Sequence, residues 1–549
     1  GVPHIQGADF LDALYGLGYL HALDRRTQLA FARAVGSGRA TELLADKPGL
    51  LESDRFLRRL GAARGIPQEV DALDERARRC LQVYCDGVND GFRQTGRSFP
   101  MWAAGVADEP WEPASALLIG NLLNLLGLAH GQQRAEHIVL DLARTGAEPN
   151  RLRELYHPYL DVADFDLLRR VKEPNFLSDE FFAETAGLAK LSGSNAWAIS
   201  PRRSRSGHAL LASDPHIEIN NHPTAWHEAV LHWDGHWMMG AALPGTPMFA
   251  VGRNERLAWG VTYSMADCCD YLIEDCRARD GVAEYRRGDA WLSFETRDES
   301  FQRKGGPREN LRAHSNPQGV LEADPLDDGD GLYLLSQWAG SAPGFGKSLA
   351  TWTALAECGE TEAAMELVRD CPEPPLCWMF ADADGHIGRQ VSGRFPKRNS
   401  NRLGVIPVPG WDESNHWDGW ISVSELPSEF DPPEGFLCSA NENLTSPDGP
   451  VLTTLPGADY RRRRIAQRLD ALPSATTDDC RELQYDVFSM QAEDLLERLL
   501  PLLPDGEAKR RLDSWDRQYR VDSKDAALFA RFYAFLVAEV FGQSPEQGG

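Results

Sequence analysis

The sequence predicts a protein built from stacked layers of helices and sheets, rather than a parallel sheet wound with helices on both faces. Three observations support this prediction. Residues from about 8 to 145 contain few helix breakers and carry apolar residues at helical spacing. Short strand-like runs follow from Ser194 to about residue 270, and helical character returns over about 460–545.

The helical first part begins with an almost unbroken segment over residues 8–44. The run Glu109-Pro110-Trp111 predicts a break, and an apolar helix is expected to follow it over 116–129. That segment has 14 residues and includes Asn121 and Asn124, whereas a membrane span needs about 20 apolar residues. We therefore expect a buried core helix and no membrane span.

The strand-rich part contains two predicted strand pairs. Ser194–Ser200 and His208–Ala212 flank a turn, and Trp378–Ala381 and Ile387–Gln390 flank the turn Asp382-Ala383-Asp384-Gly385. Residues 280–335 are charged and rich in Gly and Asp, which predicts an inserted or peripheral region.

Charge excludes some classes of partner. The 549 residues include 82 acidic and 57 basic side chains, a formal net charge of −25, which disfavours binding to nucleic acid or anionic lipid. The ten cysteines have no zinc-like spacing and are too sparse for a disulfide scaffold, so most are expected to be free and buried.

Several segments resemble known functional motifs but lack a feature that the motif requires. Gly346-Lys347-Ser348 resembles the end of a phosphate loop, but Ser341 stands where that loop needs glycine. No nucleophile elbow surrounds Ser194. His216 and His222 could hold a metal from one helix, but Pro215 and Pro223 make a helix there unfavourable.

A nucleophilic serine is suggested by the segment Gly193-Ser194-Asn195-Ala196-Trp197. If the Gly193–Ser194 bond is cut, Ser194 has a free α-amine with a pKa near 8. That amine can act as general base for the hydroxyl of the same residue. An ordinary strand start is the alternative interpretation of this segment by itself.

The chain as a whole resembles the penicillin acylase family of N-terminal nucleophile hydrolases. The matching motifs occur in the family's order over nearly the whole chain. They include Tyr15-Gly16-Leu17-Gly18-Tyr19-Leu20-His21-Ala22-Leu23-Asp24-Arg25, Glu109-Pro110-Trp111, Gly193-Ser194-Asn195-Ala196-Trp197, Asp214-Pro215-His216, Trp259-Gly260-Val261-Thr262, Pro409-Gly410-Trp411 and Ala440-Asn441. The resemblance implies an α+β fold, the four-layer αββα sandwich of these hydrolases, with a largely helical α-chain part.

The resemblance also implies a precursor that cuts itself between Gly193 and Ser194. The expected parts are an α-chain-like helical part at 1–165, a spacer at 166–193 and a β-chain-like core with insertions at 194–549. The α and β chains would remain together as a heterodimer. Family β chains generally extend further, so a longer C-terminus is expected, and the family implies a periplasmic or secreted protein.

Catalytic residues follow from the same resemblance. Ser194 matches the nucleophile and His216 the residue that contacts its amine and hydroxyl. The backbone N–H of Tyr263 and the side chain of Asn441 match the donors to the oxyanion, with Asn443 as a competing register for Asn441. Arg461 matches an arginine that supports the Asn, although a solvated basic helix start is the alternative for this four-arginine run.

A calcium site is implied as well, with no organic cofactor. Asp267, the carbonyl of Cys269, and Asp270 resemble the family's ligands, and Glu136 matches the carboxylate from the α chain. Hard oxygen ligands at this spacing suit Ca²⁺. A surface acidic turn is the alternative.

The implied activity is an amidohydrolase that cleaves a linear amide into a carboxylic acid and an amine through an acyl–Ser194 ester. Leu126, His130 and Ile217 match positions of the acyl pocket, and an aliphatic Ile217 favours an aliphatic acyl group. Candidate N-acyl substrates are acyl-homoserine lactones, lipopeptides and β-lactam side chains. A catalytically silent binding protein with the same fold, or a Ser-His-Asp hydrolase with an internal serine, are the alternatives.

Overall fold

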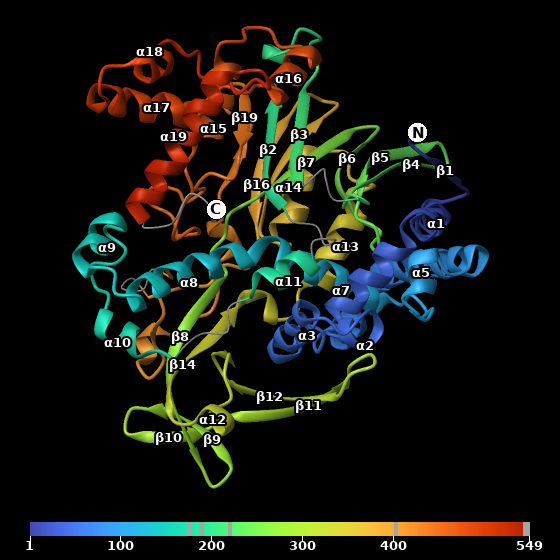
Figure 1. Cartoon of the computed structure of the whole chain (residues 1–549). Helices are drawn as coiled ribbons and strands as arrows, with labels where there is room; N and C mark the ends of the chain where they lie inside the picture. Colours follow the sequence, from blue (N-terminus) through green and yellow to red (C-terminus); the bar gives the residue numbers. More distant parts are fainter. Residues whose placement is uncertain (173–176, 186–190, 218–221, 400–403, 542–549) are drawn as a thin grey trace.

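The computed structural model describes residues 1–172, 177–185, 191–217, 222–399 and 404–541 (Figure 1). Its core has four layers: helices, an eight-stranded first sheet, a three-stranded sheet, and helices again. This order confirms the α+β prediction. A second eight-stranded sheet extends away from the four layers at the lower end of Figure 1.

The helical layer is organised around the crossing of α1 and α5. Asp9 caps α1 by accepting from Asp12 N, and Asp74 caps α5 by accepting from Ala77 N. At the crossing, a Cβ on Gly18 or Gly87 would overlap the backbone of the opposite helix, so both positions need glycine. The helices of this part are α1 (Phe10–Gly36), α2 (Ala40–Leu43), α3 (Pro48–Leu60), α4 (Ile66–Ala72), α5 (Glu75–Thr95), α6 (Phe99–Ala103), α7 (Pro113–Leu122), α8 (His130–Arg144), α9 (Pro149–Leu155), α10 (Phe165–Arg170) and α11 (Asp179–Glu184).

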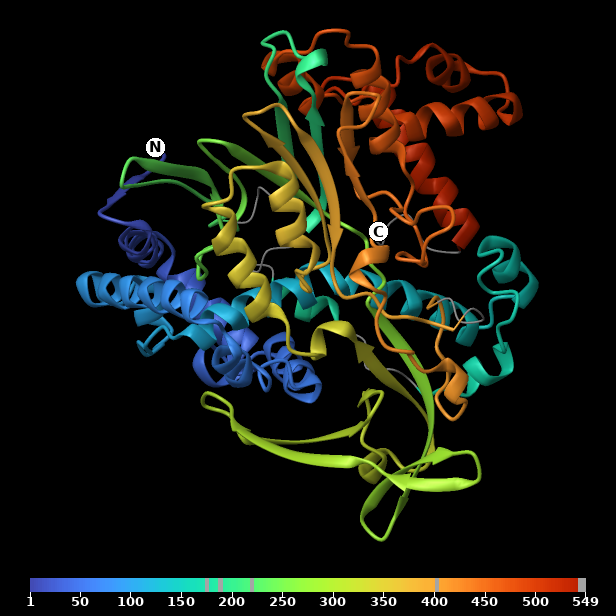
Figure 2. The same cartoon turned by 180° about the vertical axis from the view of Figure 1, so that it is seen from behind.

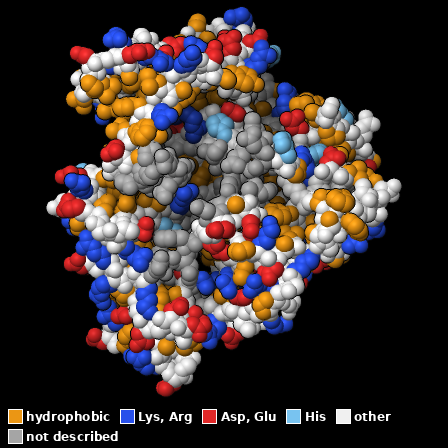
Figure 3. Space-filling view, in the orientation of Figure 1, with side chains coloured by type: hydrophobic (Ala, Val, Ile, Leu, Met, Phe, Trp, Pro, Cys, Tyr) orange, Lys and Arg blue, Asp and Glu red, His pale blue; other side chains and the backbone are white. Residues whose placement is uncertain are grey.

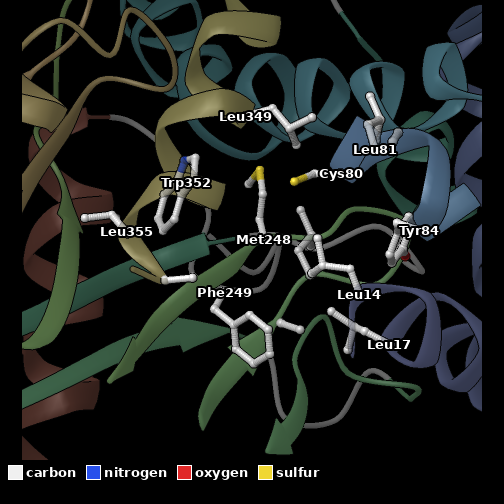
Figure 4. Close-up of a cluster of buried hydrophobic side chains, with 14 of the residues drawn as sticks. Leu14, Leu17, Cys80, Leu81, Tyr84, Met248, Phe249, Leu349, Trp352 and Leu355 are labelled. Carbon is white, nitrogen blue, oxygen red and sulfur yellow. The ribbon is translucent and has the colours of Figure 1, made fainter. Parts of the chain in front are cut away.

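The first sheet lies against α1, α5 and α7 and against α13 (Phe345–Leu355) and α14 (Thr361–Arg369), which cover its back in Figure 2. Figure 4 shows the resulting core, where Leu14, Tyr84, Met248 and Trp352 meet from separate elements. The sheet order is β1 (His4–Gly7), β4 (His227–Trp233), β5 (His236–Ala242), β6 (Phe249–Asn254), β7 (Leu257–Tyr263), β15 (Leu376–Asp382), β16 (Ile387–Ser392) and β18 (Ser428–Phe430). The predicted 378–390 hairpin is present as β15 and β16.

The three-stranded sheet has the order β19 (Phe436–Ser439), β2 (Leu191–Ile199) and β3 (Leu210–Ile217). Alternation along β2 sends Ala196 and Ala198 inward to the first sheet. Trp197 and Ile199 face outward into a cluster with α15 (Tyr460–Asp470) and α16 (Thr477–Gln484). The same alternation determines to which face of the sheet each polar side chain at the start of β2 points.

The second sheet contains most of the region that the sequence predicts to be peripheral. Its strands run in the order β10 (Ala290–Ser293), β9 (Val282–Arg287), β8 (Cys269–Arg279), β14 (Gly331–Trp338), β13 (Gly319–Leu321), β12 (Arg308–Asn316) and β11 (Glu295–Gln302). The short α12 (Pro325–Asp328) precedes β14, and β17 (Val408–Pro409) pairs with β8. Helix α8 packs on β8 and so connects the helical part to this sheet.

The apolar helix predicted over 116–129 is present, but its second half has a different helix type. Helix α7 ends at Leu122, and a π-helix occupies Leu123–Ala129 before α8 begins. Within this wider turn the Asn124 amide donates to Glu373 Oε2 at 3.1 Å, a buried polar contact that the apolar pattern did not reveal.

The expected spacer at 166–193 stays a prediction, but parts of it have defined positions. Helix α10 packs on α8, and α11 packs on α3. Strand β2 begins at Leu191 and crosses the Gly193–Ser194 peptide without a break. In this uncut chain, the predicted junction therefore lies inside a strand.

The C-terminal helices after α16 are α17 (Met490–Leu499), α18 (Glu507–Ser514) and α19 (Lys524–Phe541). Hydrophobic side chains gather over this region at the upper left of Figure 3, and Leu502, Phe535 and Val540 are exposed. Across the described parts of the chain, no helix combines the length and apolarity needed to cross a membrane. All ten cysteines are free, and all except Cys358 are buried.

Candidate active site

The candidate site lies at the start of β2, beside the end of β3. In the antiparallel register, Gly193 pairs with His216, Ser194 with Pro215 and Asn195 with Asp214. Cross-strand partners share a face of the sheet. Ser194 therefore shares the inward face with Ala196, whereas Asn195, Asp214 and His216 share the outward face toward α15.

Ser194 is buried, and its Oγ lies between two donors. The backbone N–H of Tyr263, at the end of β7, donates to Oγ at 3.3 Å, and Asn441 Nδ2 donates at 3.2 Å. These are the two groups that the resemblance names as oxyanion donors. Two such donors converging on one point can stabilise an oxygen that gains negative charge.

Asn441 is held in place by more than its contact with Oγ. Its φ of +65° is a left-handed conformation that asparagine tolerates better than most residues. Its Nδ2 also donates to the Tyr263 carbonyl at 2.8 Å, and its Oδ1 accepts from Ser194 N at 2.6 Å. The competing Asn443 is exposed, and its Oδ1 accepts from Thr445 N, so the geometry favours the Asn441 register.

Arg461, in the first turn of α15, supports the same residues from the outward side. It donates to the Ser194 carbonyl at 2.9 Å, to Asn195 Oδ1 at 2.7 Å and to Asn441 Oδ1 at 3.0 Å. Desolvation lowers the pKa of Arg461, and the charges of Glu442 and Asp214 oppose this shift. The contacts favour the supporting role over a solvated helix start.

Asp214, Asn195 and His216 form a small polar cluster next to Arg461. His216 Nε2 lies 3.2 Å from Asp214 Oδ2 and 3.0 Å from Asn195 Nδ2, and Asn195 Nδ2 lies 3.3 Å from Asp214 Oδ2. The hydrogen bond with His216 is the largest effect that lowers the pKa of Asp214. Asp214 is therefore an ionised acceptor at neutral pH.

Gly193 fits between these groups because it has no side chain. A Cβ at this position would lie 3.1 Å from Arg461 Nη2, 3.2 Å from His216 Nδ1 and 3.4 Å from Asn441 Oδ1. His216 therefore turns Nδ1 toward Gly193 and Nε2 toward Asp214.

The side chain of Tyr263 makes contacts of its own. Its hydroxyl donates to the Ala266 carbonyl at 3.3 Å, and burial raises its pKa well above the ordinary value. The ring thus connects the candidate oxyanion donor to the acidic loop that follows β7.

The predicted pocket residues lie in different surroundings. Leu126, in the π-helix, packs beside a hydrophobic cluster that contains Cys268, Cys269 and Trp338. Ile217 is half-buried at the end of β3 and pairs with Leu191. The side chain of His130 lies outside the part of the chain that the structure describes.

The predicted calcium ligands converge. Oxygen atoms of Glu136, Asp267 and Asp270, all fully buried or nearly so, lie within 4.8 Å of one another. Arg398 bonds to Asp267 Oδ2 at 3.2 Å and to Asp270 Oδ2 at 2.9 Å. Three carboxylates and one guanidinium have a formal charge of −2, which a divalent cation would balance.

The backbone near this cluster also fits a cation. Cys269 pairs with Trp338, and the flanking bond from Ala339 N to Cys268 O makes this a non-hydrogen-bonded pair. The Cys269 carbonyl is therefore directed away from β14. Burial raises the pKa of Asp267 to about 7, an effect that a nearby cation would oppose.

Three polar residues of these sites were missed by the sequence analysis in this role. Asp214 and Asn195 were read only as parts of motifs, and Arg398 was not singled out. Strand alternation could have indicated Asp214, because Asp214 and His216 are two residues apart and so lie on one face of a strand. No local pattern connects Arg398 to Asp267, which lies 131 residues away.

Comparisons with known proteins show which proteins this chain is similar to. The family model of penicillin amidase matches residues 1–546. The chain is 31% identical to acyl-homoserine lactone acylase QuiP of Pseudomonas aeruginosa, over 100% of this chain and 69% of QuiP. It is 30% identical to the penicillin acylase 2 proenzyme of Pseudomonas sp. strain SE83, over 99% and 71% of the two chains.

A solved structure shares the fold. The thermostable penicillin G acylase from Alcaligenes faecalis, in its orthorhombic form, superposes with a TM-score of 0.50 at 20% identity and covers 60% of each chain. This chain thus spans about 70% of the length of these sequence relatives and 60% of the solved chain.

Proposed function

Because this chain belongs to the penicillin amidase family, whose named relatives are amide-hydrolysing acylases, we propose that it hydrolyses a linear amide through an ester on Ser194. The observation that carries this proposal is the pair of donors, Tyr263 N and Asn441 Nδ2, that converge on Ser194 Oγ. A catalytically silent protein would have no need for this arrangement around a buried serine.

In the proposed reaction, Ser194 Oγ adds to the substrate carbonyl carbon, and the negative oxygen is stabilised by donors such as those of Tyr263 and Asn441. The carbon–nitrogen bond then breaks, and the amine leaves with a proton. Water attacks the remaining ester, which releases the carboxylic acid and restores the hydroxyl. The free α-amine of Ser194 serves as the base.

That amine exists only after the chain has been cut, so we also propose self-cleavage between Gly193 and Ser194. Oγ attacks the Gly193 carbonyl, the peptide nitrogen leaves, and water hydrolyses the resulting ester. The α and β chains remain together as a heterodimer, because β1 pairs with β4 and α1 packs on β4, and both contacts join the α-chain part to the β-chain part.

Mass spectrometry of the purified protein tests both parts. The wild type should give two chains, one of which begins at Ser194, and should hydrolyse amides. Ser194→Ala should give one uncut chain without amidase activity, while the matched variant Ser192→Ala should be cut normally. Normal cutting of Ser194→Ala would refute self-cleavage, and amidase activity in that variant would refute the acyl–serine route.

The proposed substrate is an aliphatic N-acyl compound, of which an acyl-homoserine lactone is the first candidate and an N-acyl β-lactam the second. The names of the relatives support both candidates. The aliphatic Ile217 beside His216 supports a flexible acyl chain over a phenylacetyl group. Rates for amides of increasing acyl length, compared with the phenylacetyl amide, test this choice.

We propose a structural Ca²⁺ held by Glu136, Asp267, Asp270 and the Cys269 carbonyl. Calcium would supply positive charge that ties α8, from the α-chain part, to the loop after β7. Elemental analysis should find one calcium per chain, and a chelator should lower the melting temperature until calcium is restored. In Asp270→Asn both effects should weaken. Unchanged melting with no bound metal would refute the site.

A further inference from the structure

Self-cleavage presents a problem of proton transfer that the mature enzyme does not have. In the uncut chain, Ser194 N is a peptide nitrogen that donates to Asn441 Oδ1, so it cannot act as a base. Yet as the carbon–nitrogen bond breaks, this nitrogen must gain a proton, and Oγ must lose one. Another residue is needed to carry that proton.

We propose that Asp214 is a positioning residue for self-cleavage, which holds His216 so that its Nδ1 carries a proton to the scissile peptide. This inference depends on the proposed self-cleavage and adds to it a residue whose role the family resemblance did not supply. His216 would be the catalytic residue of this step, and Asp214 would act through it.

The orientation of His216 follows from its neighbours. Arg461 donates to Asn195 Oδ1 and thereby turns the Asn195 amide nitrogen toward Asp214. The carboxylate of Asp214 then accepts from Asn195 Nδ2, and both groups contact the same ring nitrogen: His216 Nε2 lies 3.2 Å from Asp214 Oδ2 and 3.0 Å from Asn195 Nδ2. These two contacts hold Nε2 on the side of the ring that faces away from Gly193.

Because Nε2 of His216 lies beside Asp214, the other ring nitrogen, Nδ1, faces Gly193. It lies 3.2 Å from the point that a Cβ on Gly193 would occupy, on the outward side of the scissile peptide. Ser194 Oγ lies on the inward side, between Tyr263 N and Asn441 Nδ2. The attacking oxygen and the proton carrier thus approach the same peptide from opposite faces of β2.

Charged groups face the imidazole from several sides. Asp214 is the facing carboxylate on β3, Arg461 faces the cluster from α15, and Glu442 offsets part of the arginine's charge. Asp214 and His216 have equal exposed fractions, 32% each, so water reaches the pair.

The proton balance of the step is complete. Oγ bonds to the Gly193 carbon, the carbon–nitrogen bond breaks, and His216 donates the Nδ1 proton to the leaving nitrogen. The proton released from Oγ returns to Nδ1 through water. Water then hydrolyses the Gly193 ester, which leaves a C-terminal carboxylate at Gly193, a hydroxyl on Ser194 and a free α-amine. After this step the amine is available as base, so Asp214 matters less.

The test is the rate of self-cleavage of freshly purified precursor, followed by mass spectrometry from pH 5 to pH 9. Asp214→Asn should slow cleavage by about 10-fold or more near neutral pH, because general acid–base groups typically contribute at least this much. Asp214→Glu should recover part of the rate. Asp289→Asn, an exposed carboxylate in the turn between β9 and β10, should behave as the wild type.

A second measurement separates positioning from general damage. The melting temperature of uncut Asp214→Asn should equal that of the uncut Ser194→Ala precursor, so that slow cleavage is not the result of a folding defect. If Asp214→Asn cuts at the wild-type rate over the whole pH range, the role of Asp214 is refuted while the proposed function stands. If the wild type itself is never cut, the proposed self-cleavage fails instead. Should Asp214→Asn not fold, the cleavage rate of Asp214→Glu decides the question.

Discussion

Removal of the Asn441 side chain should abolish most amide hydrolysis while leaving the fold intact. In the structure, Nδ2 is one of two donors to Ser194 Oγ. Losing one preorganised oxyanion donor typically lowers kcat by ~10²–10³, equivalent to about 2.7–4 kcal/mol of barrier. Because this charge develops in the transition state, we expect the loss in kcat rather than in KM.

The backbone at this position makes the choice of variant important. Asn441 has a φ of +65°, which glycine adopts freely but alanine does not. Asn441→Gly and Asn441→Ala should therefore lose the same activity, whereas alanine should cost about 1–2 kcal/mol more in the free energy of unfolding. The two variants separate the lost donor from the strained backbone.

The assay uses protein matured to completion, with the active fraction counted from the mass of chains that begin at Ser194. Both variants should mature at least partly. Asn443→Ala is the matched control, because this neighbouring asparagine is exposed and its side chain accepts from Thr445 N. A kcat for Asn441→Gly within three-fold of the wild type, or an equal loss in Asn443→Ala, would refute the assignment.

Three further variants probe the pocket, a buried carboxyl and the helical core. Ile217→Phe should shift kcat/KM toward shorter or aromatic acyl groups, since each buried methylene contributes only ~0.8 kcal/mol; an unchanged chain-length profile would remove Ile217 from the pocket. Burial raises the pKa of Glu373 to about 8, so the folded state holds a proton that the unfolded chain releases, and stability should fall as pH rises from about 5 to 8. Urea titrations of Glu373→Gln should show a shallower fall over that range, and an identical slope would contradict the assignment. Gly120→Ala should destabilise by ~1–3 kcal/mol, because the added Cβ would overlap the Phe345 ring; combined with Phe345→Ala the effects should be less than additive, and strict additivity would count against the overlap.

The fold was predictable at the level of layers because the periodicity of each part matches its final element type. Helical spacing over 8–145 became α1 to α8, and the strand-like runs at 194–212 became β2 and β3. The π-helix at Leu123–Ala129 was not predicted, and Asn124 within it contacts Glu373, 249 residues away, which no local pattern indicates. An apolar pattern reports which side chains are buried, but it does not report what a buried amide binds.

The candidate site was predictable residue by residue only through the family resemblance. Ser194 and Arg461 are separated by 267 residues, and no spacing rule connects them. Their proposed roles stay predictions, but the structure brings them together with His216, Tyr263 and Asn441. The pocket residues were harder to place, because Leu126 and Ile217 lie in different surroundings and their positions depend on packing rather than on a motif.

Strand alternation would allow one short strand to serve both of the proposed reactions. Its inward face presents Ser194 Oγ to the donors on β7 and Asn441, and its outward face presents Gly193 and Asn195 to His216, Asp214 and Arg461. The proposed self-cleavage needs a proton carrier on the outward face, because the serine nitrogen of the uncut chain is an amide. After the proposed cut, that nitrogen would be a base attached to the nucleophile itself. The geometry therefore predicts that the outward-face variant Asp214→Asn slows maturation, that Asn441→Gly mainly lowers turnover, and that Ser194→Ala stops both reactions.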